Sequence, residues 1–370
     1  RGHMAAGRID LDLIERACAN LGDVVVDPSL WPKFMDQICQ AAGASGAMLV
    51  QTDVRTPDIP RTASIDEGIR YYFENNWHTR DMRGVRGVPL LLRGDPVIVD
   101  QDFITPDEIR RDAFYNECLF PLRMPWFAGV GFSTGEALWA MALQRSSQLG
   151  PFEAPDKRVL ATLSRRLTET ATLSTAVGRV ALVSATGALA AVRQPAIAID
   201  RLGRVLDCNA AADAIFDDDI HVKNQRLVLR DKDAKRRFDD FTTQLMTTRE
   251  TAALDAAPIT AAREGRRPVI IRALPVPPAA RNPFLGARVL LTLTSLEPEP
   301  FGSAVTLMRI FALTPAEAKL AALMVEGISP EQIAERLAIS RETVRNQLKA
   351  VFAKTQTSRQ AELVALLARI

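Results

Sequence analysis

The sequence predicts a multidomain protein in which two α+β domains are followed by an all-α domain of four helices. Its 370 residues, 47% of them hydrophobic, are too many for one ordinary core and apolar enough to fill two or three. Strand-like and helical runs alternate up to residue 297, whereas residues 313–370 read as closely spaced helices. We therefore expect about three domains.

The first α+β domain is expected over residues 5–152. We interpret residues 1–4, which end at the first methionine, as a cloning remnant. A helix, a strand and the two arms of a hairpin are predicted at residues 11–21, 47–50, 126–132 and 137–143. Ser133–Glu136 supplies the turn between the two arms.

A long connecting helix is expected over residues 153–191, where prolines and glycines almost disappear. An apolar stripe recurs in it at helical spacing: Leu160, Leu163, Leu167 and Ala171. This stripe suits a short coiled coil between two subunits, although Thr170 and Ser174 interrupt a strict heptad. It suits packing on its own domain equally well, and both alternatives stay open at this point.

Residues 192–297 are predicted to form the second α+β domain. They begin and end with strand-like runs, Ala196–Ile199 and Arg288–Thr294, around a polar helical middle. Prolines in Glu297–Pro300 block regular structure. We therefore expect a linker over residues 298–312.

Composition argues against several classes of protein. The net charge of +2 is small, so a polyanionic partner would need a local basic surface. No run of about eighteen continuous apolar residues and no secretory signal is visible. The four cysteines lack the paired spacing of a metal site or a redox disulfide: Cys18, Cys39, Cys118 and Cys208. We expect a cytoplasmic protein with reduced thiols, no membrane span and no metal.

Capping patterns define the helices of the C-terminal domain. Thr314 precedes a proline and has Glu317 at the third helical position, which is the pattern of a helix start. Gly327 can end that helix in the left-handed conformation. Ser329 repeats the capping pattern for a second helix, and Ser340 caps a third after a short turn. Two helices joined by a tight turn are the result.

The third helix has one buried and one polar face. Val344, Leu348 and Val351 follow the spacing of a buried stripe, so Arg345, Asn346 and Lys349 must point outward. Arginine can donate twice to guanine and asparagine matches the edge of adenine, while lysine can contact a base or a phosphate. Arg341, Lys354 and Arg359 extend the positive surface. The alternative is a solvated basic face with no ligand.

Several runs of this domain resemble the LuxR-type helix-turn-helix family: 313–317, 326–329, 333–337, 339–344, 346–349, 354–355 and 358–363. The resemblance implies base contacts by Arg345, Asn346 and Lys349, and phosphate contacts by Ser340, Thr343 and Gln347. Gln347 stands where the family often has histidine, but it can still donate to a phosphate. The last helix resembles the family's dimerisation helix, with core packing as the alternative role of its apolar residues: Leu363, Leu366, Leu367 and Ile370.

The second domain resembles the opening of a PAS domain in Ala196–Asp200, Gly203–Leu206 and Cys208–Ala214. Residues 267–274 and 289–294 would supply its later strands. PAS domains bind ligands or cofactors or form dimers. We assign no cofactor and leave haem on His221 as an open alternative, and we interpret Asp217–Asp219 as a polar turn instead of a metal site.

The first domain loosely resembles GAF-like or autoinducer-binding-like sensors through Gly150–Asp156 and the leucines that follow. Tyr72, Trp77 and Asp81 resemble the aromatic and acidic residues of an autoinducer pocket, although Met82 stands where that family has proline. Core packing is the alternative role for the two aromatic residues.

No catalytic motif accompanies these domains, because the sequence contains no phosphate-binding P-loop, no paired histidines and no G-x-S-x-G. We therefore predict a ligand-responsive, sequence-specific transcriptional regulator that binds double-stranded DNA as a homodimer and has no enzymatic activity. The alternative is a PAS-containing signalling scaffold or enzyme whose C-terminal helices bind a protein.

Overall fold

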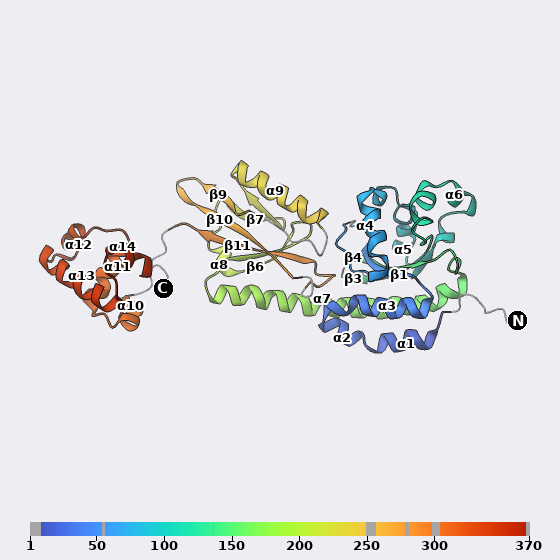
Figure 1. Ribbon diagram of the computed structural model, residues 1–370, viewed down its shortest axis with the longest axis horizontal. Coiled ribbons are helices and arrows are strands. Elements are labelled where there is room, and N and C mark those ends of the chain that lie inside the picture. Colours follow the sequence, from blue (N-terminus) through green and yellow to red (C-terminus); the bar gives the residue numbers. More distant parts are fainter. Residues whose placement is uncertain are drawn as a thin grey trace. The chain divides into compact units, whose positions relative to one another are not determined.

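The computed structural model describes residues 9–53, 56–135, 137–248, 257–277, 281–297 and 304–367. The chain divides into two compact units, residues 1–295 and residues 296–370. Figure 1 shows the helices and strands of each unit. The first unit contains two sheets, which we call the N-terminal and the middle region, and the second unit is helical.

The N-terminal region is a four-stranded antiparallel sheet with helices on both faces (Figure 1). Its strands, in the spatial order β1-β4-β3-β2, are β1 Gly46–Gln51, β2 Val97–Val99, β3 Trp126–Thr134 and β4 Ala137–Arg145. Its helices are α1 Leu11–Ala19, α2 Leu21–Val26, α3 Trp31–Ala42, α4 Asp66–Glu74, α5 Val88–Leu92 and α6 Pro106–Arg111. The predicted helix, strand and hairpin are confirmed.

Short 3-10 and π-helical turns fill the connections: Pro28–Leu30, Ala63–Ile65, Trp77–Thr79, Arg83–Gly87, Asp100–Asp102 and Phe114–Leu119. Alternation along β4 separates the two faces of the sheet. Trp139, Met141 and Leu143 join the core under α1, α3 and α7, whereas Ala140 and Ala142 face α5 on the other side. The small alanines leave room on that second face.

A single helix of 38 residues, α7 Ala154–Ala191, follows the sheet. The predicted stripe of Leu160, Leu163, Leu167 and Ala171 is fully buried in the core of the N-terminal region, so it packs on its own region and not on a second subunit. Farther along, Leu173, Val177, Val180 and Val183 are exposed.

By length and composition, α7 is also the one helix among the described residues that could cross a membrane. Its most apolar window of 18 residues has a mean hydropathy of 1.4, and 11% of that window is buried. The sequence contains no continuous apolar run of this length, but a window average tolerates the polar residues that interrupt the helix. Since the first half of α7 belongs to a core, the finding is weak support for a membrane span.

The middle region is a five-stranded antiparallel sheet in the order β6-β5-β11-β10-β9. Its strands are β5 Ala196–Asp200, β6 Val205–Cys208, β9 Ile259–Arg263, β10 Arg266–Pro275 and β11 Ala287–Ser295, and a separate hairpin pairs β7 Ile220–Lys223 with β8 Arg226–Leu229. The helices are α8 Ala210–Asp213 and α9 Lys232–Thr247. As predicted, strands begin and end this region and Asn209 caps a helix, accepting from the amide of Ala212.

The acidic run 217–219 behaves as a polar turn. Asp217 accepts from the amides of Asp219 and Ile220, both at 3.0 Å, and pairs with Arg263 and Arg266. No group of metal-binding side chains is found among the described residues. These carboxylates therefore close the turn onto the neighbouring strands.

The second unit is a bundle of short helices, α10 Ala304–Phe311, α11 Pro315–Val325, α12 Pro330–Leu337, α13 Arg341–Thr355 and α14 Gln360–Leu367. The four predicted helices are present. A fifth, α10, lies inside the segment that the sequence predicted as a linker. Leu307 of α10 is buried with Leu313, Val351 and Leu363, and this burial stabilises the helix. The prolines that precede α10 had led to the prediction of a linker.

Candidate DNA-binding surface and ligand cavity

Both α12 and α13 begin with a serine cap, and the turn between them lies at residues 338–340. The Ser329 hydroxyl accepts from the amide of Gln332 at 3.3 Å, and the Ser340 hydroxyl accepts from the amide of Thr343 at 3.0 Å. Ala338 ends α12 in the left-handed conformation with φ of 51°, which turns the chain sharply. Ile333 and Val344 are buried in one cluster below the turn, so α12 and α13 are fixed against each other.

The outer face of α13 presents the donors that the sequence predicted. Arg345, Asn346 and Lys349 are exposed, while Val344 and Val351 are buried. An exposed row of donors on a helix that a neighbouring helix supports is suited to the major groove.

The other predicted DNA-binding residues differ in their surroundings. Arg341 and Arg359 are exposed, and the hydroxyls of Ser340 and Thr343 share a hydrogen bond of 2.8 Å at the start of α13. Gln347 is half-buried, with a buried Oε1 that has no hydrogen bond within the described residues. Its amide nitrogen would have to supply any phosphate contact.

Lys354 forms an ion pair with Glu317 of the same unit. Its ammonium donates to Glu317 Oε2 at 2.7 Å, and Glu317 also closes the capping box of α11. Leu363 and Leu367 are fully buried in the same unit, Leu366 is half-buried, and Ile370 lies outside the described residues. In the structure, Leu363 and Leu367 therefore have the alternative role of core packing.

Comparison with known families assigns this unit. Residues 312–367, from the residue before Leu313 to the end of α14, match the family described as bacterial regulatory proteins, luxR family. These residues form a LuxR-family helix-turn-helix domain. Because that family regulates transcription, the chain is a transcriptional regulator. The LuxR-family domain occupies only the C-terminal end of the chain, so it assigns nothing to the two regions before it.

Solved structures give fainter likenesses. The phage VqmA–DPO complex is 17% identical, with 51% of this chain and 89% of that chain covered and a TM-score of 0.21. The E. coli DhaR(N)–DhaL complex is 13% identical, with coverage of 80% and 92% and a TM-score of 0.24. Neither score supports an argument about fold or function. A search of curated proteins finds no match.

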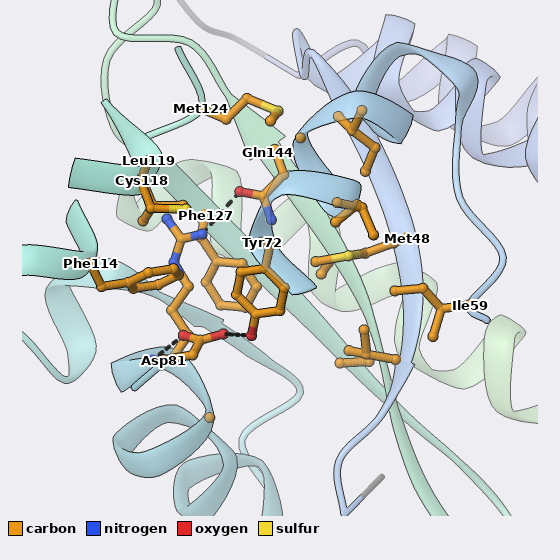
Figure 2. Close-up of a pocket in the computed structure, with 18 of the residues that line it drawn as sticks. Met48, Ile59, Tyr72, Asp81, Phe114, Cys118, Leu119, Met124, Phe127 and Gln144 are labelled. Atoms are coloured by element: carbon orange, nitrogen blue, oxygen red, sulfur yellow. Dashed lines mark hydrogen bonds between the residues drawn. The ribbon is translucent and has the colours of Figure 1, made fainter. Parts of the chain in front are cut away.

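A cavity of about 90 Å³ lies in the N-terminal region on the α5 face of the sheet (Figure 2). Most of its wall is apolar, with Met48, Ile59, Ile69, Leu119 and Phe127 among the lining residues. It is assembled from the strands β1 to β4, the helices α4 and α5 and the turns and loops between them, which lie far apart in the sequence. An apolar cavity with few polar groups is the usual form of a small-molecule site.

Two of the three predicted pocket residues line this cavity. The Tyr72 hydroxyl donates to Asp81 Oδ2 at 2.8 Å, and the backbone amide of Arg83 donates to Asp81 Oδ1 at 2.9 Å. Trp77 does not line it. Its ring is buried beside Phe114, which does line the cavity, with ring centroids 6.1 Å apart. Trp77 therefore packs as a core aromatic behind the cavity wall.

Arg83 and Gln144 form the polar side of the cavity, and neither residue was predicted from the sequence. Arg83 donates to Asp100 at 3.2 Å, to Gln144 Oε1 at 3.0 Å and to the carbonyl of Pro125 at 2.8 Å. Asp100 also accepts from the Tyr115 hydroxyl at 2.5 Å and from the amide of Phe127 at 2.6 Å. One indication was available, because Gln144 directly follows an apolar run, Ala137–Leu143, in a strand pattern.

Burial and charge oppose each other in this cluster. Burial lowers the pKa of Arg83, but Asp100, Tyr115 and Asp81 together outweigh it and the pKa is raised, so Arg83 stays a cation. Burial raises the pKa of Asp100, and its hydrogen bonds from Arg83, Tyr115 and Phe127 oppose that rise. Burial also raises the pKa of the Cys118 thiol in the cavity wall to about 12, which keeps it protonated and unreactive.

A buried ionic cluster joins the cavity wall to the middle region. Thr56, which lines the cavity, accepts from Arg201 Nη1 at 3.0 Å, and the same nitrogen donates to the carbonyl of Asp58 at 3.1 Å. The Asp58 carboxylate pairs with Arg288 and, at 3.9 Å, with Arg281. Burial, followed by the nearby charge of Arg288, lowers the pKa of Arg201 to about 10.

Packing reinforces this connection. Phe284 of the middle region sits among the rings of Trp31, Trp139 and Phe132, with centroid distances of 5.2, 5.2 and 5.9 Å. The Asn282 amide donates to the carbonyl of Ser174 on α7 at 2.7 Å. The N-terminal and middle regions therefore share buried polar and aromatic contacts.

A second hollow, of about 350 Å³, lies in the middle region between α9 and the sheet. Its polar residues, Arg237, Asp240 and Gln244, are exposed, as are Ala257 and Pro258 at its edge. It is a surface hollow, whereas the cavity of the N-terminal region has buried walls. The cavity is therefore the stronger candidate for a ligand site.

Proposed function

We propose that this protein is a ligand-responsive, sequence-specific DNA-binding regulator that acts as a dimer. The observation that carries the proposal is the exposed row of Arg345, Asn346 and Lys349 on α13 of a LuxR-family domain. In this proposal Arg345 and Asn346 read base edges in the major groove, and Lys349 contacts a base or a phosphate.

Backbone contacts position the domain on DNA. Ser340 and Thr343 lie at the start of α13, where the helix dipole favours a phosphate. Arg341 and Arg359 are exposed cations beside it, and the Gln347 amide nitrogen donates to a phosphate oxygen. Lys354 keeps its pair with Glu317 and adds long-range positive potential more than a direct contact.

We propose that residues 5–152 form a GAF-like sensor and residues 192–297 a PAS-like domain, connected by α7. The order of the strands supports the PAS-like assignment. When the five strands of the middle sheet are numbered along the chain, their spatial order is 2-1-5-4-3, and helices lie between the second and third strands in the sequence. We assign neither a cofactor nor an enzymatic activity. A regulator of this kind works in the cytoplasm, where its DNA is.

Dimerisation is proposed through α7 and the last helix. Leu173, Val177, Val180 and Val183 leave an apolar face of α7 in contact with solvent, which a second copy would cover. Leu366 of α14 is half-buried and can contribute to the same assembly. A two-fold symmetric dimer reads two half-sites about one helical turn of DNA apart.

The ligand response is proposed to start in the cavity. In this proposal a bound molecule displaces the lining residues Thr56 and Ile59. Asp58 lies between them and contacts Arg201 and Arg288, so the displacement moves these two residues of the middle region. The separation of the two LuxR-family domains in the dimer then shifts. Such a shift requires a ligand that binds the two arrangements with different affinity.

A mobility-shift experiment with the full chain and genomic fragments tests the DNA-binding proposal. We expect specific binding that weakens steeply as salt concentration rises. Arg345→Ala should lose the preference for the selected fragment, with Arg158→Ala, an exposed arginine of α7, as the matched control. Binding that does not distinguish the selected fragment from random duplex would favour the alternative, a signalling scaffold or enzyme whose helices bind protein.

A further inference from the structure

The side-chain amide of Gln144, in the cavity wall, has a donor without a partner among the described residues. Gln144 is 5% exposed, and its Oε1 accepts from Arg83 Nη1 at 3.0 Å. Because a guanidinium only donates, the amide oxygen must face Arg83, which turns Nε2 toward the cavity. Figure 2 shows this nitrogen on the side of the Tyr72 ring. Within the described residues no hydrogen bond is made by Nε2, so this donor is free to bond an acceptor inside the cavity.

The other polar end of the cavity is an acceptor. The two oxygens of Asp81 each take one hydrogen bond, from Tyr72 and from the amide of Arg83, which leaves lone pairs available. In Figure 2 the Tyr72 ring lies between the Gln144 amide and the Asp81 carboxylate. A ligand that uses both groups therefore carries its acceptor and its donor at opposite ends.

Charge and size restrict the ligand further. Asp100 already balances Arg83, so Asp81 leaves a net negative wall that repels anions, and the apolar remainder disfavours any ion. About 10–15 Å³ is needed for each water-sized group, so 90 Å³ admits roughly six to nine such groups. A cavity of about 150 Å³ holds benzene, so a six-membered ring enters here only when flexible side chains of the wall, Met48 and Met124 among them, move outward, and a long chain is excluded.

We propose that this cavity binds a compact, uncharged molecule with one ring and about eight non-hydrogen atoms. A carbonyl oxygen at one end accepts from Gln144 Nε2, and a hydroxyl at the other end donates to Asp81. The inference rests on the proposed function, since it identifies the chemistry of the ligand in the cavity proposed there.

Calorimetry on the full chain without DNA tests this with rings of equal size. The probes are 4-hydroxycyclohexanone, 4-methylcyclohexanone and 4-methylcyclohexanol, with cyclohexanecarboxylate as the anion. We expect 4-hydroxycyclohexanone to bind tightest, each single-group analogue about tenfold weaker, and the anion weakest.

Gln144→Glu isolates the amide nitrogen. The variant keeps an oxygen for Arg83 but replaces the donor by an acceptor, so it should lose at least tenfold in affinity for the two ketones and little for 4-methylcyclohexanol. Gln148→Glu makes the same charge change on an exposed loop residue and should bind like the wild type. Intrinsic tryptophan fluorescence reports whether the N-terminal region stays folded, since Trp31, Trp77, Trp126 and Trp139 all lie there.

Three results overturn the inference: no saturable binding of 4-hydroxycyclohexanone to the wild type at millimolar concentration, tighter binding of the carboxylate, or equal ketone affinity in folded Gln144→Glu. Operator binding is measured separately by mobility shift. If the protein binds its operator but not 4-hydroxycyclohexanone, only the proposed ligand chemistry is wrong. If it binds 4-hydroxycyclohexanone but no operator, only the DNA-binding proposal is wrong.

Discussion

The outer face of α13 and the cavity of the N-terminal region use the same kinds of side chain in opposite surroundings. Arg345 and Asn346 are exposed and solvated, whereas Arg83 and Gln144 are buried and hydrogen-bonded to protein. Water replaces the partner of an exposed donor, but nothing replaces the partner of a buried one. A substitution on α13 should therefore change DNA binding alone, and one around the cavity should change stability first.

The largest effect is expected for Arg83→Met. The substitution leaves Asp100 as an uncompensated buried charge and Gln144 without its donor, which should cost about 3–5 kcal/mol in the free energy of unfolding. Urea unfolding followed by tryptophan fluorescence measures it. Arg80→Met, which removes a more exposed arginine of the same segment, is the control, and equal losses in the two variants would contradict the buried cluster.

The second largest effect is expected for Asp58→Asn, which should lower the free energy of unfolding by about 2–3 kcal/mol. An amide still accepts a hydrogen bond but no longer neutralises Arg288. All four tryptophans lie in the N-terminal region, so fluorescence follows that region while circular dichroism follows the whole chain. The wild type should show coincident transitions for the first unit, and the variant separate ones. Asp36→Asn, on the exposed side of α3, should leave the coincidence intact.

Substitutions of exposed residues in the LuxR-family domain should have smaller effects, and these should appear only in DNA binding. Arg345→Ala should cost about 1–3 kcal/mol at one base position and relax the preference there, while Arg359→Ala should weaken all sequences alike and lower the salt slope by about 1. Neither variant should change the urea midpoint. Footprinting of both on one operator is the measurement, and a large loss of stability in either would mean that the residue is not free on the surface.

The smallest effect concerns pH. The hydrogen bond from Lys354, with that from the amide of Thr314, lowers the pKa of Glu317 below its usual value of about 4.3. A carboxyl with a lowered pKa stabilises the fold above its unfolded pKa and loses that stabilisation as pH falls through the folded one. The LuxR-family domain should therefore lose stability below about pH 4. Thermal melts of Glu317→Gln should lack this dependence, and an unchanged pH profile would show that the pair does not contribute.

Local patterns specified much of the molecule. The caps at Thr314, Ser329 and Ser340 and the buried stripe of Val344 and Val351 depend on neighbours within a few residues, so the helices of the LuxR-family domain and their outward donors were predictable. The hairpin of β3 and β4 and the strands β5 and β11 were readable for the same reason. The role of α10 was not, because prolines near it indicated a linker and only the burial of Leu307 makes the helix stable.

The outward-facing residues of α13 could be read from the sequence alone, because helical periodicity places them once the buried stripe is known. The cavity could not be read in this way, because it depends on contacts between distant parts of the chain. Arg83 meets Asp100 across 17 positions and Gln144 across 61, and Asp58 meets Arg288 across 230. No short-range pattern encodes such pairings, since they arise when packed elements bring distant side chains into one buried space where each must find a partner.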